Sequence, residues 1–270
     1  MNKHRAAAFF VALQVILAVT MTVPVAAQEG GTKDCSQTST GQVPIMDLGT
    51  DTYQGQEGGL YPGGSNEVPA DHEALGLWRA SQIVPRDAAG DPDPGGTIVL
   101  LSIGVSNTRM EWQNLRRQAV DAVAPDVTIV NGSQPGEDVS TWQDVAGEPW
   151  IGIEGLLANN DVTPEQVQAA WIMLPESVDS VAEIPPFPED AQTYRDELAV
   201  VVRNAMDHFP NLQVAYLSSR MYAGYNTTGR PNPEPLAYEE GFGVKWLIGD
   251  QIEGDLSLNT DERRGEVEAP

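Results

Sequence analysis

The chain has 270 residues, of which 39 are acidic and 15 are basic, and its formal net charge is −24 at pH 7. Such a surface repels nucleic acid and anionic lipid, which makes both poor partners. The single cysteine, Cys35, cannot form an internal disulfide, so the fold must be held by a hydrophobic core.

The first 27 residues have the pattern of a secretory signal peptide. A basic start, MNKHR, precedes the apolar run AAAFFVALQVILAVTMTV, and small residues end at Ala27, before Gln28. The run is about as long as the shortest membrane-spanning helices, so an uncleaved anchor is the alternative. We expect a secreted or cell-envelope protein without membrane contact after cleavage. Loss of Lys3 and Arg5, with no acid lost, takes the charge from −24 to −26.

Residues 28–43 are small and polar and are expected to form a flexible leader. The following stretch to Pro69 is rich in Gly and Pro but also holds apolar side chains, so we interpret it as a packed covering loop. Tyr61 and Asn66 within it would suit a carbohydrate. The run GQEGGLYPGGSN lacks the Lys-Ser/Thr of a phosphate-binding loop.

The rest of the chain alternates helical and strand patterns. Apolar periodicity predicts helices, and short runs that are apolar along their whole length predict strands. Helices are predicted over 70–83, 109–123, 151–159, 189–209 and 235–251, and strands over 97–103, 126–130, 167–174 and 212–217. The charged residues 255–270 are expected to form an acidic disordered tail.

Strands that alternate with helices in this way indicate a parallel sheet covered on both faces. We therefore predict a single α/β domain over 44–254, with three α/β/α layers and a mainly parallel sheet. Ligands of such sheets bind beyond the carboxyl ends of the strands. The four strand ends read SIGVSN, NGSQPGED, LPES and SSRMYAGY, and all are rich in small polar residues.

The order of these motifs resembles that of the SGNH, or GDSL-like, hydrolases over roughly residues 97–250. That family has a nucleophilic Ser in a Gly-Asp-Ser turn after its first strand, and the matching residues here are Gly104-Val105-Ser106. Its second block supplies a Gly whose N–H binds the oxyanion, which matches Gly136. The resemblance implies a flavodoxin-like sheet and an esterase or deacetylase activity that needs no cofactor.

Two blocks of the family pattern are not matched. The third block has an Asn after the third strand, whereas Pro175 and Glu176 follow WIML here. The last block, Asp-x-x-His, corresponds to NPEPLAYEE, which has Glu234 where the acid is wanted and no His. A Ser hydroxyl needs a base within hydrogen-bond reach to attack an ester at neutral pH.

The candidates for this base are two carboxylates and one histidine. Of the two histidines outside the signal peptide, His208 ends a predicted helix that leads into a strand, which places it at the opposite edge of the sheet. His72 precedes the first strand and would reach the site if the Gly-rich segment folded over the strand ends. Glu234 and Glu239 are the unconventional alternatives.

Four further residues are candidates for substrate binding. Asn107 follows the nucleophile turn and could instead cap the next helix. Arg220 could hold a carboxylate or sugar hydroxyls, or form a structural ion pair. Tyr222 and Tyr225 follow the fourth strand and could stack on a sugar ring.

The acidic and metal-ligating residues do not form a known metal-binding motif. Asp87, Asp91 and Asp93 could offer oxygens to Ca²⁺, but the run lacks the spacing and the closing Glu of an EF-hand. One cysteine and few histidines argue against a transition-metal site. We therefore predict an active site without metal.

Two functions are compatible with these residues. The first is a secreted carboxylesterase or carbohydrate deacetylase that acts on an acylated polysaccharide or another small ester through Ser106. The second keeps the fold without catalysis, as a secreted glycan-binding or cell-surface protein. A base close to the Ser106 hydroxyl favours the first function, and the missing Asn and Asp-x-x-His blocks favour the second.

Overall fold

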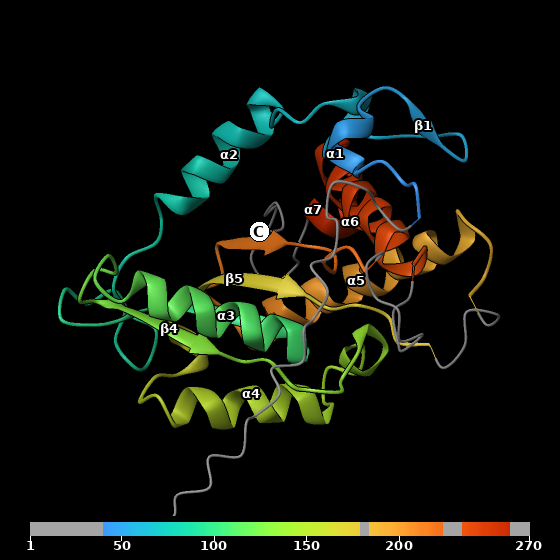
Figure 1. The fold of residues 1–270 in the computed structure, drawn as a ribbon. Coiled ribbons are helices and arrows are strands. Elements are labelled where there is room, and N and C mark those ends of the chain that lie inside the picture. The colour runs from blue at the N-terminus through green and yellow to red at the C-terminus, as the bar shows by residue number, and fades with distance from the viewer. Residues whose placement is uncertain (1–39, 179–183, 224–233, 260–270) are drawn as a thin grey trace, which may run out of the picture. The chain divides into compact units, whose positions relative to one another are not determined.

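Four parallel strands form the centre of the computed structural model, which describes residues 40–178, 184–223 and 234–259 (Figure 1). Their order across the sheet is β4-β3-β5-β6, and every neighbouring pair is parallel, as the sequence predicts. The strands are β3 (Ile98–Gly104), β4 (Val127–Asn131), β5 (Val167–Met173) and β6 (Val214–Leu217). The predicted signal peptide, Cys35 and Tyr225 lie outside the described residues.

A longer helix follows each strand, and none of the helices in the described ranges is long and apolar enough to cross a membrane. These helices are α3 (Ser106–Ala119), α4 (Glu148–Ala158), α5 (Glu189–His208) and α6 (Leu236–Ile252). The other elements are α1 (Ile45–Leu48), α2 (Ala70–Ala80), α7 (Leu256–Asn259), the hairpin β1 (Thr52–Tyr53) with β2 (Gln56–Glu57), and the 3-10 turns Pro62–Gly64, Val139–Trp142 and Pro164–Gln166.

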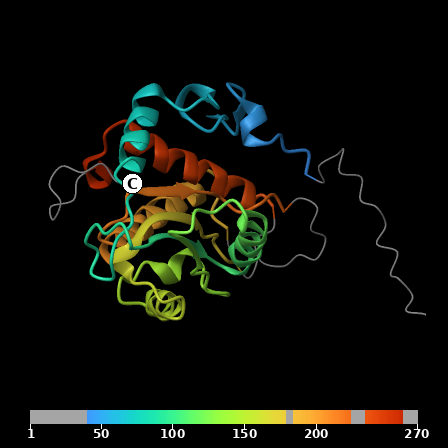
Figure 2. The ribbon, with the colours of Figure 1, turned by 90° about the vertical axis from the view of Figure 1, so that its left-hand side faces the viewer.

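Different helices cover the two faces of the sheet. Leu101 and Ile172 are fully buried on one face, in a cluster with Ile153 of α4 and with side chains of α5. The opposite face carries Trp171, which stacks on Trp112 of α3 at a centroid distance of 5.5 Å. The sheet is therefore the middle layer of an α/β/α arrangement. At its β6 edge, α2 lies beside the strand and the second half of α6 (Figure 2).

The Gly-rich segment that precedes α2 packs on α6. Tyr53 of β1 stacks on Phe242 at a centroid distance of 5.8 Å, and its hydroxyl donates to Glu239 at 2.7 Å. Burial and the neighbouring Glu239 raise the pKa of Tyr53 to about 12, so the hydroxyl stays protonated. The covering loop that the sequence predicts thus packs against the first half of α6.

The prediction of disorder from residue 255 onward is wrong for Leu256–Asn259, which form the short helix α7. Leu258 is only 6% exposed and joins the main core cluster. One buried leucine therefore anchors a segment whose charged sequence otherwise favours solvent.

Asn204 joins α5 to the chain around the turn Val139–Trp142. Its amide donates to the carbonyl oxygens of Trp142 and Gln143, at 3.0 Å each. Replacing Asn204 with Ala leaves both carbonyl groups without this partner, so we expect the free energy of unfolding to fall by about 2 kcal/mol in urea denaturation. The neighbouring exposed side chain provides the control, since Arg203→Ala should change stability by less than about 0.5 kcal/mol. Equal losses in both variants would contradict this account.

Candidate functional site at the carboxyl ends of the strands

Ser106 lies at the carboxyl end of β3, where α3 begins, and its side chain is exposed. The first intrahelical bond runs from the N–H of Arg109 to the carbonyl of Val105 at 3.0 Å. The N–H groups ahead of Arg109 have no intrahelical acceptor, and together with the helix dipole they favour negative charge.

Ser106 also lies where the strand order changes direction. The chain leaves β3 toward β4 on one side and later returns to β5 on the other. Ligand crevices of parallel sheets lie at such a switch point.

The turn that leads into α3 has room only for glycine. A Cβ on Gly104 would lie 2.1 Å from Thr108 Oγ1 and 2.4 Å from the carbonyl oxygen of Met173. The Thr108 hydroxyl accepts the N–H of Val105 at 3.1 Å and donates to the carbonyl of Met173 at 2.8 Å. Directly after this close approach of the turn to β5, α3 begins at Ser106, three residues before the predicted position.

The turn after β4 lies beside the turn after β3. The N–H of Gln134 donates to the carbonyl of Gly104 at 2.8 Å. Gly136 follows in an exposed turn with φ of 94°, a conformation that glycine adopts without strain. The structure therefore brings Ser106 and Gly136 to the same edge of the sheet.

Two of the predicted binding residues are located by simple contacts. Asn107 is the second residue of α3, so the alternative that it caps this helix is wrong, because Val105 holds the capping position. The hydroxyl of Tyr222 forms a hydrogen bond with the hydroxyl of Thr40. Tyr225 lies outside the described residues and is not located.

Glu234 ties the chain after β6 to the start of α6. Its two oxygens accept the N–H groups of Ala223 at 2.6 Å and Tyr238 at 3.0 Å. Burial raises the pKa of Glu234, and these N–H groups and the charge of Arg220 lower it in part. Arg220 faces both Glu234 and Glu240; burial lowers its pKa, and the two acids act in the opposite direction. Each oxygen of Glu234 keeps a second lone pair, so the carboxylate can still accept a proton.

Three carboxyl groups lie beneath this edge of the sheet. Glu240 of α6 is 1% exposed and Asp190 of α5 is 4% exposed. Glu240 Oε1 accepts the backbone N–H of Glu176, which follows β5, at 2.9 Å. The side chains of Glu176 and Asp190 are hydrogen-bonded to each other. These three residues form the buried carboxyl cluster, which joins the end of β5 to α5 and α6.

Burial keeps most of this cluster protonated at neutral pH. Burial, followed by the charges of Asp190 and Glu240, raises the pKa of Glu176 to about 9. Burial raises the pKa of Glu240 to about 8, although backbone N–H groups and the charge of Arg220 act in the opposite direction. The pKa of Asp190 is also raised by burial. Acids this close to one another cannot all ionise, because each negative charge disfavours the next.

The buried carboxyl cluster is not predicted from the sequence. Glu176 stands where the SGNH pattern has Asn, but its partners come from two later helices. One signal is present in the run LAYEEGFGVKWL, in which Glu240 lies between Tyr238 and Phe242 on a helix that is apolar on most sides. An acid on such a surface requires partners once it is buried.

His72 lies on α2, away from the Ser106 turn. It lines a hollow of about 380 Å³ together with Tyr61, Tyr216 and Ile248, and neither Ser106 nor Gly136 belongs to this lining. Its ring centroid is 6.4 Å from that of Tyr61. The Gly-rich segment therefore does not carry His72 over the strand ends, as its use as a base would require.

His208 ends α5, the position that the sequence predicts. Its Nε2 lies 2.7 Å from the carbonyl oxygen of Val145, and its ring stacks on Trp150 at a centroid distance of 4.7 Å. Its Nδ1 is 3.7 Å from Glu154. These contacts give His208 a structural role at the edge of the sheet opposite Ser106.

Of the three aspartates considered for Ca²⁺, two stabilise turns with their carboxylates. Asp87 Oδ1 accepts the N–H groups of Ala89 at 2.9 Å and Asp91 at 3.0 Å, and Asp93 Oδ1 accepts the N–H of Gly95 at 2.8 Å. In the part of the chain that the structure describes, no group of three His, Cys, Asp or Glu side chains is arranged to hold a metal ion.

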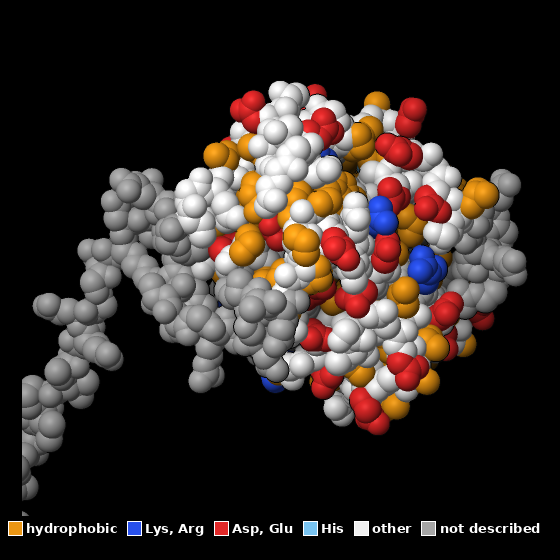
Figure 3. Space-filling model, turned by 90° about the vertical axis from the view of Figure 1, so that its right-hand side faces the viewer, with side chains coloured by type: hydrophobic (Ala, Val, Ile, Leu, Met, Phe, Trp, Pro, Cys, Tyr) orange, Lys and Arg blue, Asp and Glu red, His pale blue; other side chains and the backbone are white. Residues whose placement is uncertain are grey.

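The face toward which the strands point is strongly acidic. Figure 3 views the molecule from this side and shows acidic side chains spread over it, with few basic ones between them. The formal net charge of −24 acts in the same direction. Neutral ligands are therefore favoured over anionic ones at this edge.

No family model matches the chain, and no curated protein and no solved structure is similar enough to be matched. The resemblance to SGNH hydrolases thus rests on the residues of the chain alone, and the site is interpreted from its own geometry.

The buried carboxyl cluster predicts that stability falls as pH rises. An ordinary Glu ionises near pH 4.5, whereas Glu240 in the folded protein has a pKa of about 8. Between these values the folded state retains a proton that the unfolded state loses, so the free energy of unfolding decreases by up to about 1.4 kcal/mol per pH unit for each such group. We expect Glu240→Gln to reduce the slope of the free energy of unfolding against pH, and to be more stable than the parent protein at about pH 8.

Urea denaturation at a series of pH values measures this effect. The exposed Glu67, changed to Gln, is the matched control and should leave the slope unchanged. Identical slopes for the parent protein and Glu240→Gln would show that Glu240 ionises normally in the folded state.

Proposed function

We propose that the protein is an ester hydrolase that acts outside the cytoplasm, with Ser106 as nucleophile and an acylated carbohydrate or another small ester as substrate. The observation that carries this proposal is the exposed Ser106 at the start of α3, beside the Gly136 turn. The N–H groups of Ser106 and Gly136 would stabilise the oxyanion that forms during acyl transfer. The signal-like first 27 residues support export.

Glu234 is the general base in this proposal. It precedes α6 at the same end of the sheet, where the SGNH pattern has its acid. The N–H groups of Ala223 and Tyr238 fix its orientation, and burial raises its pKa toward the range in which a base works well. His72 has no part in the reaction, because it lines a separate hollow beside β6.

The reaction runs through an acyl-enzyme. Ser106 Oγ bonds to the acyl carbon while its proton passes to Glu234. The tetrahedral intermediate then breaks its bond to the alcohol oxygen, which leaves with the proton from Glu234. Water attacks the acyl-serine with Glu234 again as base, and the carboxylic acid is released with Ser106 restored.

Glycan binding without catalysis is the second candidate function. One observation favours it: the Ser106 side chain has no hydrogen bond to any histidine or carboxylate among the described residues. A serine hydroxyl without a base is a weak nucleophile. In this case the same strand ends, including Arg220 and Tyr222 after β6, would recognise a sugar and leave it intact.

The test is hydrolysis of p-nitrophenyl acetate and of acetylated xylo-oligosaccharides by the form that starts at Gln28. We expect Ser106→Ala to remove the activity and Glu234→Gln to lower kcat by about 100-fold or more. The acidic limb of the pH profile of kcat/KM, which reports the ionisation of Glu234, should disappear with Glu234→Gln.

Two variants serve as controls for these losses. Ser133 is 5% exposed and lies 3.4 Å from the hydroxyl of Ser102, so Ser133→Ala should keep the activity. His72→Ala should also keep it. Full activity in Ser106→Ala would overturn the proposal. A parent protein that binds the oligosaccharides without cleaving them, and that loses this binding with Arg220→Ala but keeps it with Gln192→Ala, would establish the second function.

A further inference from the structure

We propose a second binding site, for a neutral carbohydrate, in a polar cavity of about 640 Å³ between the hairpin β1–β2, α5 and α6. This volume lies within the range of small-ligand pockets. Gln56, Gln192, Trp246 and Asp250 belong to its lining, and Ser106 does not. The site therefore does not depend on the reaction proposed at Ser106.

Lys245 fixes one wall of the cavity. Its side chain is 5% exposed, and its Nζ donates to the carbonyl oxygens of Glu57, at 2.8 Å, and Gly58. The Glu57 carboxylate is 3.7 Å away. These bonds hold the hairpin against α6, so the wall is formed before a ligand arrives, and the ammonium group is already engaged.

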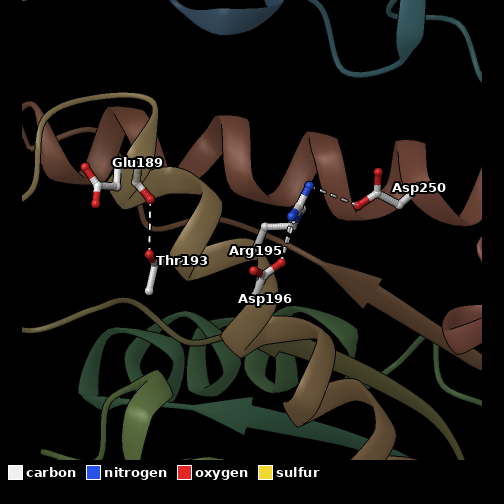
Figure 4. A network of polar contacts seen from close by, with 5 residues as sticks. All are labelled: Glu189, Thr193, Arg195, Asp196 and Asp250. Carbon is white, nitrogen blue, oxygen red and sulfur yellow. Dashed lines mark hydrogen bonds and ion pairs between the residues drawn. The ribbon is translucent and has the colours of Figure 1, made fainter.

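Arg195 is the other cationic side chain of the cavity, and it is also engaged. It pairs with Asp196 at 2.8 Å and with Asp250 of α6 at 3.4 Å (Figure 4). Glu57 and Glu253 add negative charge to the same lining. A phosphate or carboxylate ligand would therefore meet acids and no spare positive charge, which excludes anionic ligands.

The polar side chains that remain are suited to hydroxyl groups. The amides of Gln56 and Gln192 and the hydroxyls of Thr50 and Thr52 make no hydrogen bond to another described residue. An amide both donates and accepts, as a sugar hydroxyl does, and the carboxylates of the lining accept from hydroxyl groups. An apolar ligand would leave these groups without partners, which argues against a lipid.

Trp246 supplies the apolar surface that a sugar ring needs. Its ring lies 5.9 Å from the rings of Phe187 and Phe242, which fix its orientation, and it is only partly buried. The apolar face of a pyranose can pack on the indole while its hydroxyls reach the amides. One aromatic ring beside several amides and carboxylates therefore points to a neutral saccharide.

The test uses calorimetric titration of unsubstituted xylohexaose, cellohexaose and mannohexaose. The protein is the Ser106→Ala form that starts at Gln28, so that hydrolysis cannot contribute. We expect at least one of these sugars to bind with a Kd below about 1 mM, and Gln192→Ala and Trp246→Ala each to weaken this binding about tenfold or more. Gln192 is exposed, so its replacement leaves the fold intact even if Trp246→Ala does not. Trp78→Ala, at a tryptophan of α2 that is 53% exposed, is the matched control and should bind as before.

No binding of any of these sugars at about 10 mM would overturn the inference. So would sugar binding that Gln192→Ala and Trp246→Ala leave unchanged. A parallel titration in which the polycation spermidine binds and the sugars do not would also overturn it. If the parent protein has no esterase activity but sugar binding depends on Gln192, the result supports this site and refutes only the proposed hydrolysis. If the parent protein has esterase activity but no sugar binds, the result supports the proposed hydrolysis and refutes only this site.

Discussion

A cluster of buried carboxyl groups fixes the end of β5, and the candidate site lies at this end of the sheet. Glu176 donates its backbone N–H to Glu240 and shares a side-chain hydrogen bond with Asp190. Ionised, these groups would carry a large desolvation cost, whereas protonated they act as neutral hydrogen-bonding partners. The start of α3 is attached to β5 as well, because the Thr108 hydroxyl donates to the carbonyl of Met173. The position of Ser106 therefore depends on a buried cluster in which Glu176 and Glu240 are neutral at pH 7.

The excess of acidic residues also determines which ligands the surface can bind. With 39 acidic against 15 basic residues, the chain has few cations to offer a ligand. Where cations do occur near a cavity, as with Arg195 and Lys245, they hold parts of the protein together. Both proposed sites therefore suit neutral ligands, an ester at the strand ends and a sugar beside α6. A polysaccharide that carries acyl groups would satisfy both sites.

The order of the elements could be predicted because it is written in local patterns. The run that forms β3 is apolar along its length, and its predicted bounds of 97–103 differ by one residue from Ile98–Gly104. The start of α3 is not given by such a pattern: the helix is predicted to begin at residue 109 and begins at Ser106. The turn before it lies against Met173 of another strand, a contact that the local sequence does not show.

The candidate site was accessible to sequence reasoning only in part. A Gly-x-Ser turn after an apolar strand marks Ser106, and a Gly turn after the next strand marks Gly136. The sequence also allows His72 as a base, but α2 takes this residue to the β6 edge, a placement that no local pattern encodes. The partners of Glu176 arise from α5 and α6, so the buried carboxyl cluster becomes visible only when three elements are assembled.

Isotope-edited NMR of the side-chain carboxyl carbons shows whether Glu176 and Glu240 stay protonated at neutral pH. We expect titration midpoints far above 4.5 for both residues, with Glu240 at about 8. We also expect Glu240→Gln to lower the midpoint of Glu176, because a neighbouring negative charge is removed. Midpoints near 4.5 for both residues would show that these acids are ionised at neutral pH and that protonated carboxyl groups do not hold the end of β5.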